Sequence, residues 1–282
     1  MPALIIHGGA GRMRSRPERD KRADVLLEIA RNAWSALSHG QSALDVAVNA
    51  TVHLEDCPLF NAGRGSSLQC DGGARLSAAL MGSEHERFSG VINVEGIVNP
   101  IQLAAHLQNE TDRVLGGDGA LARARELGLT EGDVRTEEAI QTWRERTEGK
   151  TGTVGVVALD DQGRIAAATS TGGRGMERVG RVSDSATVAG NFATRSAGVS
   201  CTGIGEDILN GALASRLVTL VEAGVPLTQA ASQLADRMEK SEWKAGFIAL
   251  DEHGNWAAPY TTDIMYWVAI DTAGEHRFTD PG

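Results

Sequence analysis

One threonine in this chain stands where a hydroxyl group could become a nucleophile. Thr153 begins the apolar run TVGVVALD, directly after Gly152 and a long polar stretch. A threonine hydroxyl is a weak nucleophile unless a base lies beside it. If the chain broke between Gly152 and Thr153, the new α-amino group, with a reference pKa of about 7.7–8.0, would be that base. From these residues alone, an ordinary β-branched strand residue is the simpler interpretation of Thr153.

A second group of residues could bind a zwitterion. The segment GRVSDS, residues 180–185, holds Arg181 and Asp184 three positions apart. Arginine can bind a carboxylate through two parallel hydrogen bonds, and aspartate can accept hydrogen bonds from an ammonium group. The alternative is that the two side chains form a surface ion pair with little effect on stability.

The segment SCTGIGED, residues 200–207, is typical of a strand-to-helix turn. Backbone N–H groups at Gly203 and Gly205, together with the hydroxyl of Thr202, could stabilise an oxyanion there. The alternative is that Thr202 caps the helix and the glycines make the turn. We interpret Cys201 as a buried, small apolar residue.

Composition excludes several classes of function. The chain has 282 residues and a net charge of −10, so binding to nucleic acid or to an anionic membrane is not expected. Three cysteines are too few for a disulfide framework and fit a reducing compartment. We find no signal peptide and no apolar run of membrane-spanning length, and we therefore expect a cytoplasmic protein. The sequence also lacks a phosphate-binding loop, a dinucleotide fingerprint and a cluster of zinc ligands.

Hydrophobic periodicity predicts an alternation of strands and helices. A polar, charged stretch at 129–152 is the best candidate for a mobile linker. Helices grouped between hairpin-connected strands suggest two packed sheets with helices outside. We expect strands at 3–7, 75–81, 88–94, 153–160, 165–171, 186–193, 197–202, 246–259 (a hairpin) and 264–271, and helices at 20–38, 42–55, 99–108, 120–128, 137–146, 205–222 and 226–239.

Taken together, these segments resemble the plant-type L-asparaginase and isoaspartyl peptidase family of N-terminal-nucleophile hydrolases. The resemblance covers most of the chain, with the linker as the gap, and several long motifs follow one another in the family's order. They are IIHGGAG (5–11), LEDCPLFNAGRGSSLQCDG (54–72), NPIQLA (99–104), TGTVGVVALDDQGRIAAATSTGG (151–173), GRVSDS (180–185) and SCTGIGE (200–206).

The resemblance implies an α/β fold, the four-layer αββα sandwich, formed by residues 1–282 as a single domain. It implies self-cleavage before Thr153 into subunits 1–152 and 153–282, which would assemble as a homodimer of processed protomers. Thr153 would be the nucleophile, and Thr171 would orient it. Arg181, Asp184, Asn61 and Gly205 would bind the substrate, and Thr202 and Gly203 would serve both substrate binding and the oxyanion.

The same resemblance implies a structural sodium ion and no cofactor for catalysis. The loop LEDCPLFNAGRG is similar to one whose backbone carbonyls bind sodium, and carbonyl oxygens suit a hard cation. The alternative is a loop held by its own hydrogen bonds. The expected carbonyl donors are Leu54, Glu55, Cys57, Phe60, Ala62 and Arg64.

We therefore expect a self-processing amidohydrolase that cleaves β-aspartyl dipeptides and L-asparagine. Two alternatives remain: a glycosylasparaginase-like hydrolase, and an unprocessed, weakly active family member that binds small amino acids. The sequence departs from the family pattern around the site, which leaves cleavage efficiency and substrate preference open. The departures are at Arg75–Leu76–Ser77–Ala78, at Lys244–Ala245–Gly246, and in YTTDIMYW at 260–267.

Overall fold

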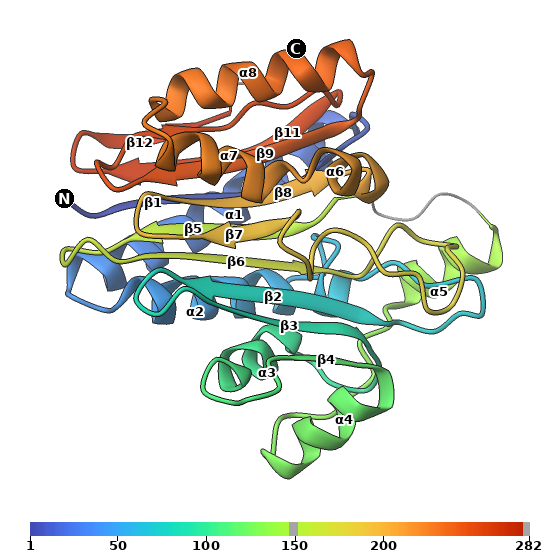
Figure 1. Cartoon of the computed structure of the whole chain (residues 1–282). Helices are drawn as coiled ribbons and strands as arrows, with labels where there is room; N and C mark the ends of the chain where they lie inside the picture. The colour runs from blue at the N-terminus through green and yellow to red at the C-terminus, as the bar shows by residue number, and fades with distance from the viewer. Residues whose placement is uncertain (147–151, 279–282) are drawn as a thin grey trace.

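The larger of two β-sheets carries the strand that begins after Gly152. A computed structural model describes residues 1–146 and 152–278, and their strands form an eight-stranded and a four-stranded sheet (Figure 1). The larger sheet is antiparallel except for its β3–β4 edge. In spatial order it contains β12 (Gly274–Arg277), β11 (Ile264–Asp271), β1 (Ala3–Gly11), β5 (Val154–Leu159), β6 (Ile165–Thr171), β2 (Leu76–Gly82), β3 (Arg87–Val94) and β4 (Val114–Gly116).

The smaller sheet packs against the centre of the larger one. Its strands β8 and β9 contact β1, β5 and β6. Side chains such as Ile5, Val157 and Ile248 are fully buried between the two sheets. Burial on both faces explains why β5, VGVVAL, has no polar side chain. In spatial order the smaller sheet contains β10 (Trp256–Ala257), β9 (Ala245–Asp251), β8 (Ala197–Gly203) and β7 (Asn191–Ala193).

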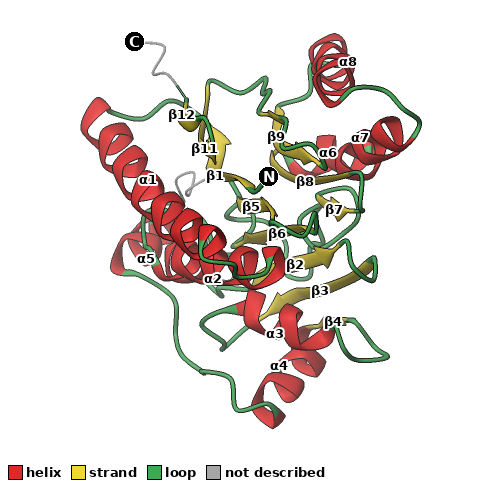
Figure 2. Ribbon diagram, turned by 90° about the vertical axis from the view of Figure 1, so that its left-hand side faces the viewer, coloured by secondary structure: helices red, strands yellow, loops and turns green. Residues whose placement is uncertain are grey.

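Helices cover the outer faces of the sheets. Helices α1 (Arg16–Ser38) and α2 (Ala43–Asp56) contact the larger sheet, while α7 (Leu213–Glu222) and α8 (Leu227–Lys240) contact the smaller one. Figure 2 shows the strands between these two pairs of helices. The fold is therefore mixed α/β, with sheets flanked by helices. The remaining helices are α3 (Pro100–Leu107), α4 (Gly117–Glu126), α5 (Glu137–Arg144), α6 (Gly205–Gly211) and the short η1 (Gly63–Gly65). Within the described residues, no helix has both the length and the apolar character to cross a membrane.

Local sequence accounts for these helix positions. The Ser42 hydroxyl accepts a hydrogen bond from the Asp45 amide at 3.1 Å, which caps α2. Pro100 occupies the first turn of α3, where its missing N–H costs nothing. In α8, Leu227, Ala230, Ala231, Leu234 and Met238 are buried, which is the spacing of one helical face.

One predicted helix and one predicted strand were wrong for a shared reason. The helix expected at 205–222 is two helices, broken at Ala212, which has a φ of 47°. The amides of Ala214 and Ser215, in the first turn of α7, donate to the carbonyls of Ala189 and Val188. These two N–H groups have no acceptor within the helix, and the loop before β7 supplies one for each. The loop therefore turns at 186–190, and only Asn191–Ala193 of the strand expected at 186–193 forms β7.

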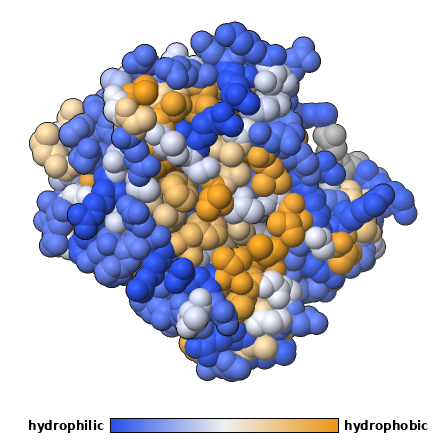
Figure 3. Space-filling view, in the orientation of Figure 1, coloured by the Kyte–Doolittle hydropathy of each residue, from blue (hydrophilic) through white to orange (hydrophobic). Residues whose placement is uncertain are grey.

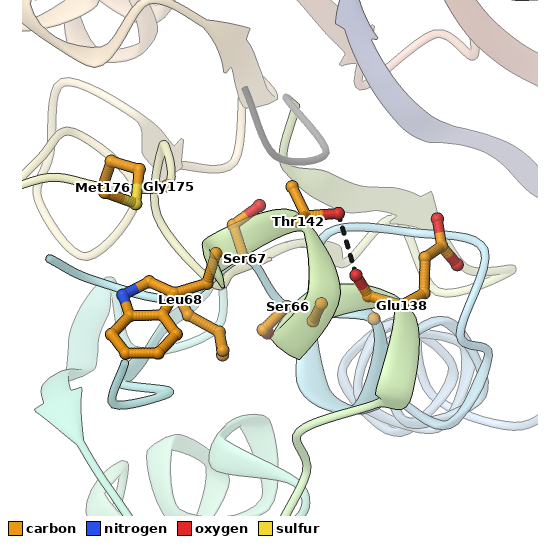
Figure 4. A pocket seen from close by; sticks show the side chains of 10 residues that line it. Ser66, Ser67, Leu68, Glu138, Thr142, Gly175 and Met176 are labelled. Atoms are coloured by element: carbon orange, nitrogen blue, oxygen red, sulfur yellow. Dashed lines mark hydrogen bonds between the residues drawn. The ribbon is translucent and has the colours of Figure 1, made fainter. Parts of the chain in front are cut away.

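Much of the predicted linker is attached to the fold. Val134 is buried, and the Trp143 indole donates to the Cys70 carbonyl at 3.3 Å. Helix α5 thus packs on the glycine-rich loop. Between them lies a pocket of about 20 Å³, whose lining side chains are drawn in Figure 4. That volume fits about one water molecule and no amino acid. Residues 147–151 of the predicted linker lie outside the described residues.

The remaining differences from the prediction are small. Helix α1 begins at Arg16, one turn before the expected start, and the short strands β4 and β12 were not predicted. Both strands lie at the edges of the larger sheet, and strands of three or four residues carry little hydrophobic pattern.

Candidate active site

Three threonines from three strands meet at the start of β5. The Thr153 hydroxyl donates to Thr171 Oγ1 at 3.3 Å, and the Thr153 amide donates to Thr202 Oγ1 at 3.1 Å. Antiparallel pairing of Val154 with Ser170 places Thr153 beside Thr171, and the packing of the smaller sheet brings Thr202 from β8. All three are buried, and Thr153 is 6% exposed. The structure thus brings the predicted nucleophile together with both predicted threonine partners.

Gly152 adopts a backbone conformation that other residues rarely take. Its φ is 108°, and a Cβ atom there would lie 2.9 Å from the Gly9 Cα. Its carbonyl oxygen accepts a hydrogen bond from Asn61 Nδ2 at 2.8 Å. Asn61 Nδ2 also donates to the Gly173 carbonyl, at 2.6 Å. Asn61 Oδ1 accepts a hydrogen bond from the Ser67 amide at 2.9 Å. Asn61 is therefore held rigidly against the carbonyl of the peptide bond that precedes Thr153.

The Thr202–Gly203 segment is fixed by backbone contacts. Gly203 has a φ of 128°, and a Cβ there would lie 2.4 Å from the Lys244 carbonyl oxygen. The Ile204 amide donates to that same oxygen at 2.7 Å. Helix α6 begins after Ile204 without a side-chain cap, and the Thr202 hydroxyl instead accepts hydrogen bonds from the Thr153 and Ala10 amides. The helix-capping interpretation of Thr202 is wrong, whereas Cys201 is fully buried as expected.

Arg181 and Asp184 lie near each other without forming the ion pair that was the alternative interpretation. Arg181 Nε and Nη2 instead donate to the two carboxylate oxygens of Glu206, each at 2.8 Å. Asp184 is buried; its Oδ1 accepts from the Ser183 hydroxyl at 2.7 Å, and its Oδ2 has no hydrogen-bond partner among the described residues. Burial raises the pKa of Asp184 to about 6.

Sequence analysis missed Glu206 as a functional residue, although it ends the quoted motif SCTGIGE. The signal was an acidic residue directly after the glycine turn, 25 positions after an arginine for which Asp184 was the one counter-charge considered. Hydrogen bonds from Arg181 lower the pKa of Glu206 and keep its carboxylate ionised.

A pocket of about 660 Å³ opens over these residues. This volume lies in the range of small-molecule sites. Asn61 and Thr202 stand behind its wall, where they hold other site residues in place. Of the predicted site residues, Gly152, Thr153, Thr171, Arg181, Asp184, Gly203 and Gly205 line it, and the cationic side chains Arg12, Arg146, Arg174 and Lys244 stand around it with Asp263.

A buried polar chain lies between the sheets next to the threonines, and sequence analysis did not predict it. The His7 ring contacts the Ser200 hydroxyl at 3.0 Å, Ser200 contacts Thr169 at 2.6 Å, and Thr169 donates to Asn191 at 2.9 Å. Burial lowers the pKa of His7 to about 3, so the ring is neutral near pH 7. A visible signal was the presence of polar residues inside the otherwise apolar strands IIHG and AATST.

The loop predicted to bind sodium packs against the nucleophile's neighbours. The Ser170 hydroxyl donates to Glu55 Oε1 at 2.6 Å, and burial raises the pKa of Glu55 to about 8. A Cβ on Gly65 would lie 1.7 Å from the Phe60 carbonyl oxygen, so the loop's backbone is tightly folded. The carbonyls of Cys57 and Ala62 accept hydrogen bonds from Phe60 and Gly65. In the described part of the chain, no cluster of acidic, histidine or cysteine side chains is arranged to hold a metal.

Comparisons with known proteins show which sequences this chain resembles. A family model described as asparaginase matches residues 1–279. The chain is 45% identical to an isoaspartyl peptidase/L-asparaginase of Synechocystis, with 94% of this chain and 86% of the relative covered. A Nostoc protein of the same name is 41% identical, with 94% and 90% covered. A plant-type L-asparaginase of Pyrococcus abyssi is 36% identical, with 90% and 92% covered.

Proposed function

The chain belongs to the asparaginase family, and from that premise we propose that it is an isoaspartyl peptidase and L-asparaginase with Thr153 as its nucleophile. The observation that carries this proposal is the meeting of Thr153 with Thr171 and Thr202 in a pocket that also holds Arg181 and Asp184. A nucleophile beside a zwitterion-binding pair suits an amide on the side chain of an amino acid.

Maturation would precede catalysis. Cleavage between Gly152 and Thr153 would leave subunits 1–152 and 153–282 and free the Thr153 amine. Two features favour that bond: the positive φ of Gly152 and the Asn61 hydrogen bond to the Gly152 carbonyl, which polarises it toward attack by the Thr153 hydroxyl. The helices on both sheets fit the four-layer αββα sandwich that this family implies.

In the mature site, the Thr153 amine would accept the proton of the Thr153 hydroxyl as its oxygen attacks the substrate's side-chain carbonyl. The resulting oxyanion would lie against Thr202 and Gly203. Collapse of this intermediate would return the proton to the leaving amine and form a β-aspartyl ester. Water would then cleave the ester, release aspartate and restore the hydroxyl. Thr171, which accepts a hydrogen bond from the Thr153 hydroxyl, would orient the nucleophile in each step.

Arg181 and Asp184 account for selectivity between linkage isomers. A β-linked aspartyl residue keeps its α-carboxylate and α-ammonium free, so both side chains would find partners. An α-linked residue has its carboxylate in the peptide bond, which would leave the Arg181 guanidinium facing a neutral amide. When one substrate leaves a polar group of the site without a partner, kcat/KM can favour the other substrate by up to about 10⁴-fold.

The remaining assignments are proposals of the same kind. A sodium ion would be held by the carbonyls of Leu54, Glu55, Cys57, Phe60, Ala62 and Arg64 and would stiffen the loop behind Asn61; the dense folding of this loop on Gly63 and Gly65 supports a carbonyl-lined site. We further propose a cytoplasmic homodimer of processed protomers that binds neither nucleic acid nor membrane, in keeping with the net charge of −10.

A side-by-side assay tests the proposed function. The mature protein would be given β-aspartyl-leucine, α-aspartyl-leucine, L-asparagine and N-acetylglucosaminyl-asparagine, and the released amine would be measured. We expect hydrolysis of β-aspartyl-leucine, slower hydrolysis of L-asparagine, and none of the α-linked dipeptide. Similar rates on both dipeptides would contradict the role of Arg181, and faster cleavage of the glycosylated substrate would indicate a glycosylasparaginase.

A further inference from the structure

The guanidinium of Arg181 is held along one edge before any substrate binds. Its Nε and Nη2 atoms donate to the two oxygens of Glu206, and the Arg181 side chain is 14% exposed. The other terminal nitrogen, Nη1, can donate to another carboxylate. Glu206 therefore fixes the orientation of the guanidinium at the pocket.

A hydroxyl group stands between Arg181 and Asp184. Arg181 Nη2 donates to Ser183 Oγ at 3.3 Å, and the Ser183 hydroxyl donates to Asp184 Oδ1 at 2.7 Å. Gly205 lies against the same atoms, because a Cβ there would be 1.8 Å from Ser183 Oγ and 2.7 Å from Asp184 Oδ1. The four groups form a chain from Glu206 to Asp184 in which the two opposite charges of Arg181 and Asp184 do not touch.

A direct bond between these two charges would disable the site. A partly buried arginine three residues from a buried aspartate would gain from pairing with it, since Coulomb attraction is strong away from water. Once paired, neither group would be available to a ligand. The second Asp184 oxygen, Oδ2, lies buried against Gly190 without a hydrogen-bond partner among the described residues, so neither carboxylate oxygen of Asp184 is paired with Arg181.

We propose that Glu206 and Ser183 are positioning residues that hold Arg181 and Asp184 apart, so that each is available to one end of an amino-acid zwitterion. This inference rests on the proposed function. In it, Arg181 Nη1 donates to the α-carboxylate and the Asp184 carboxylate accepts from the α-ammonium. Glu206 touches no reacting atom and acts only through Arg181.

Calorimetric binding of L-aspartate, the product of the proposed reaction, tests this role without requiring turnover. In Glu206→Gln, an amide cannot accept both arginine hydrogen bonds, so Arg181 turns toward Asp184. We expect affinity to fall about 10- to 100-fold, the usual range for loss of a charged hydrogen bond. If Glu206 instead competes with the ligand's carboxylate for Arg181, its loss would make L-aspartate bind more tightly. Affinity within threefold of wild type, tighter binding, or no L-aspartate binding by the wild-type protein would each overturn the proposal.

A matched ion pair elsewhere in the chain supplies the control. Arg31 Nε and Nη2 donate to the two oxygens of Glu275 at 2.9 and 3.0 Å, the same geometry on an exposed surface. Glu275→Gln should leave L-aspartate affinity unchanged.

Ser183→Ala removes the hydroxyl between Arg181 and Asp184 and should weaken L-aspartate binding, as Glu206→Gln does. In an Arg181→Gln background, adding Glu206→Gln should have no further effect, whereas a full additional loss would contradict action through Arg181.

The pH profile of binding separates positioning from general damage. Asp184 is faced by Arg181, Glu206 and the thiol of Cys201. In the wild type, affinity should decline as Asp184 is protonated near pH 6. In Glu206→Gln, loss of the neighbouring negative charge and pairing of Arg181 with Asp184 both lower the pKa of Asp184, so the decline moves to lower pH. An unmoved profile would contradict the proposal. Protein that binds L-aspartate with this pattern but hydrolyses no β-aspartyl amide would contradict the proposed function alone.

Discussion

At the scale of single residues, the site depends on hydrogen bonds that serve more than one partner. The Thr202 hydroxyl accepts from two amides, and Asn61 uses both of its N–H groups on carbonyls. These side chains lie behind the pocket wall, whereas both were predicted to bind substrate and Thr202 also to stabilise the oxyanion. Their positions show that they also hold the backbone around Thr153, which the sequence alone did not reveal.

Asn61→Ala should slow the proposed self-cleavage. The substitution removes the side-chain donor that the described part of the chain provides to the Gly152 carbonyl. Loss of one oxyanion-type donor costs about 10²–10³-fold in rate. The measurement is the half-time of conversion to two fragments on denaturing gels. A half-time within threefold of the wild type would show that this hydrogen bond does not polarise the bond.

Arg181→Ala should abolish hydrolysis while the fold persists. Loss of a buried charged contact costs about 2–5 kcal/mol, which is roughly 30- to several-thousand-fold in kcat/KM. The assay is kcat/KM on β-aspartyl-leucine, with a thermal melt to confirm folding. A decrease smaller than threefold would show that Arg181 does not bind substrate.

Asp184 should make product inhibition depend on pH. Its pKa is raised to about 6, so the carboxylate that pairs with an ammonium group is present above that pH and is lost below it. The inhibition constant of L-aspartate should therefore increase, which means weaker binding, as pH falls from 7 to 5. An inhibition constant that stays flat over this range would contradict an essential charge on Asp184.

At the scale of elements, the break between α6 and α7 explains why the strand and helix were mispredicted together. Residues 205–222 have one continuous helical pattern, and the pattern contains no glycine at the break itself, where Ala212 has a φ of 47°. The break is fixed by hydrogen bonds from Ala214 and Ser215 to a loop 25 residues earlier. Single-sequence periodicity cannot detect such a long-range partner.

Ala212→Gly should stabilise the protein. Alanine in the left-handed region costs about 1 kcal/mol that glycine does not incur, although the greater freedom of glycine in the unfolded chain offsets part of this gain. We expect the melting temperature to rise by roughly 1–3 °C. Gly224→Ala, a change in the opposite direction at another left-handed position, should lower it. A lower melting temperature for Ala212→Gly would show that Ala212 is held there without strain.

At the scale of the whole molecule, most strands and helices followed from their hydrophobic patterns, and the site did not. Buried runs such as those of β5 and β6 are recognisable because both faces of the strand are covered. The convergence of Thr153, Thr171 and Thr202 depends on how two sheets stack, which no local pattern encodes. The family resemblance supplied that information, while the Glu206 contact with Arg181 became visible only in three dimensions.

Charge is distributed unevenly over the molecule. The chain carries a net charge of −10, yet Arg12, Arg174 and Lys244 line the pocket. β-Aspartyl-leucine has one net negative charge and L-asparagine has none, so electrostatic steering should favour the dipeptide. Raising the salt concentration from about 10 to 500 mM should lower kcat/KM more for the dipeptide than for L-asparagine. Equal salt dependence would show that these cations do not attract substrate.

The central claim is that Thr153 becomes an N-terminal nucleophile, and the intact mass of freshly purified protein tests it most directly. We predict two polypeptides, residues 1–152 and 153–282, with the second beginning TVGVV on N-terminal sequencing. Thr153→Ala, which lacks the hydroxyl, should remain one chain. A wild-type protein that stays a single chain after several days of incubation, yet is folded, would contradict the claim.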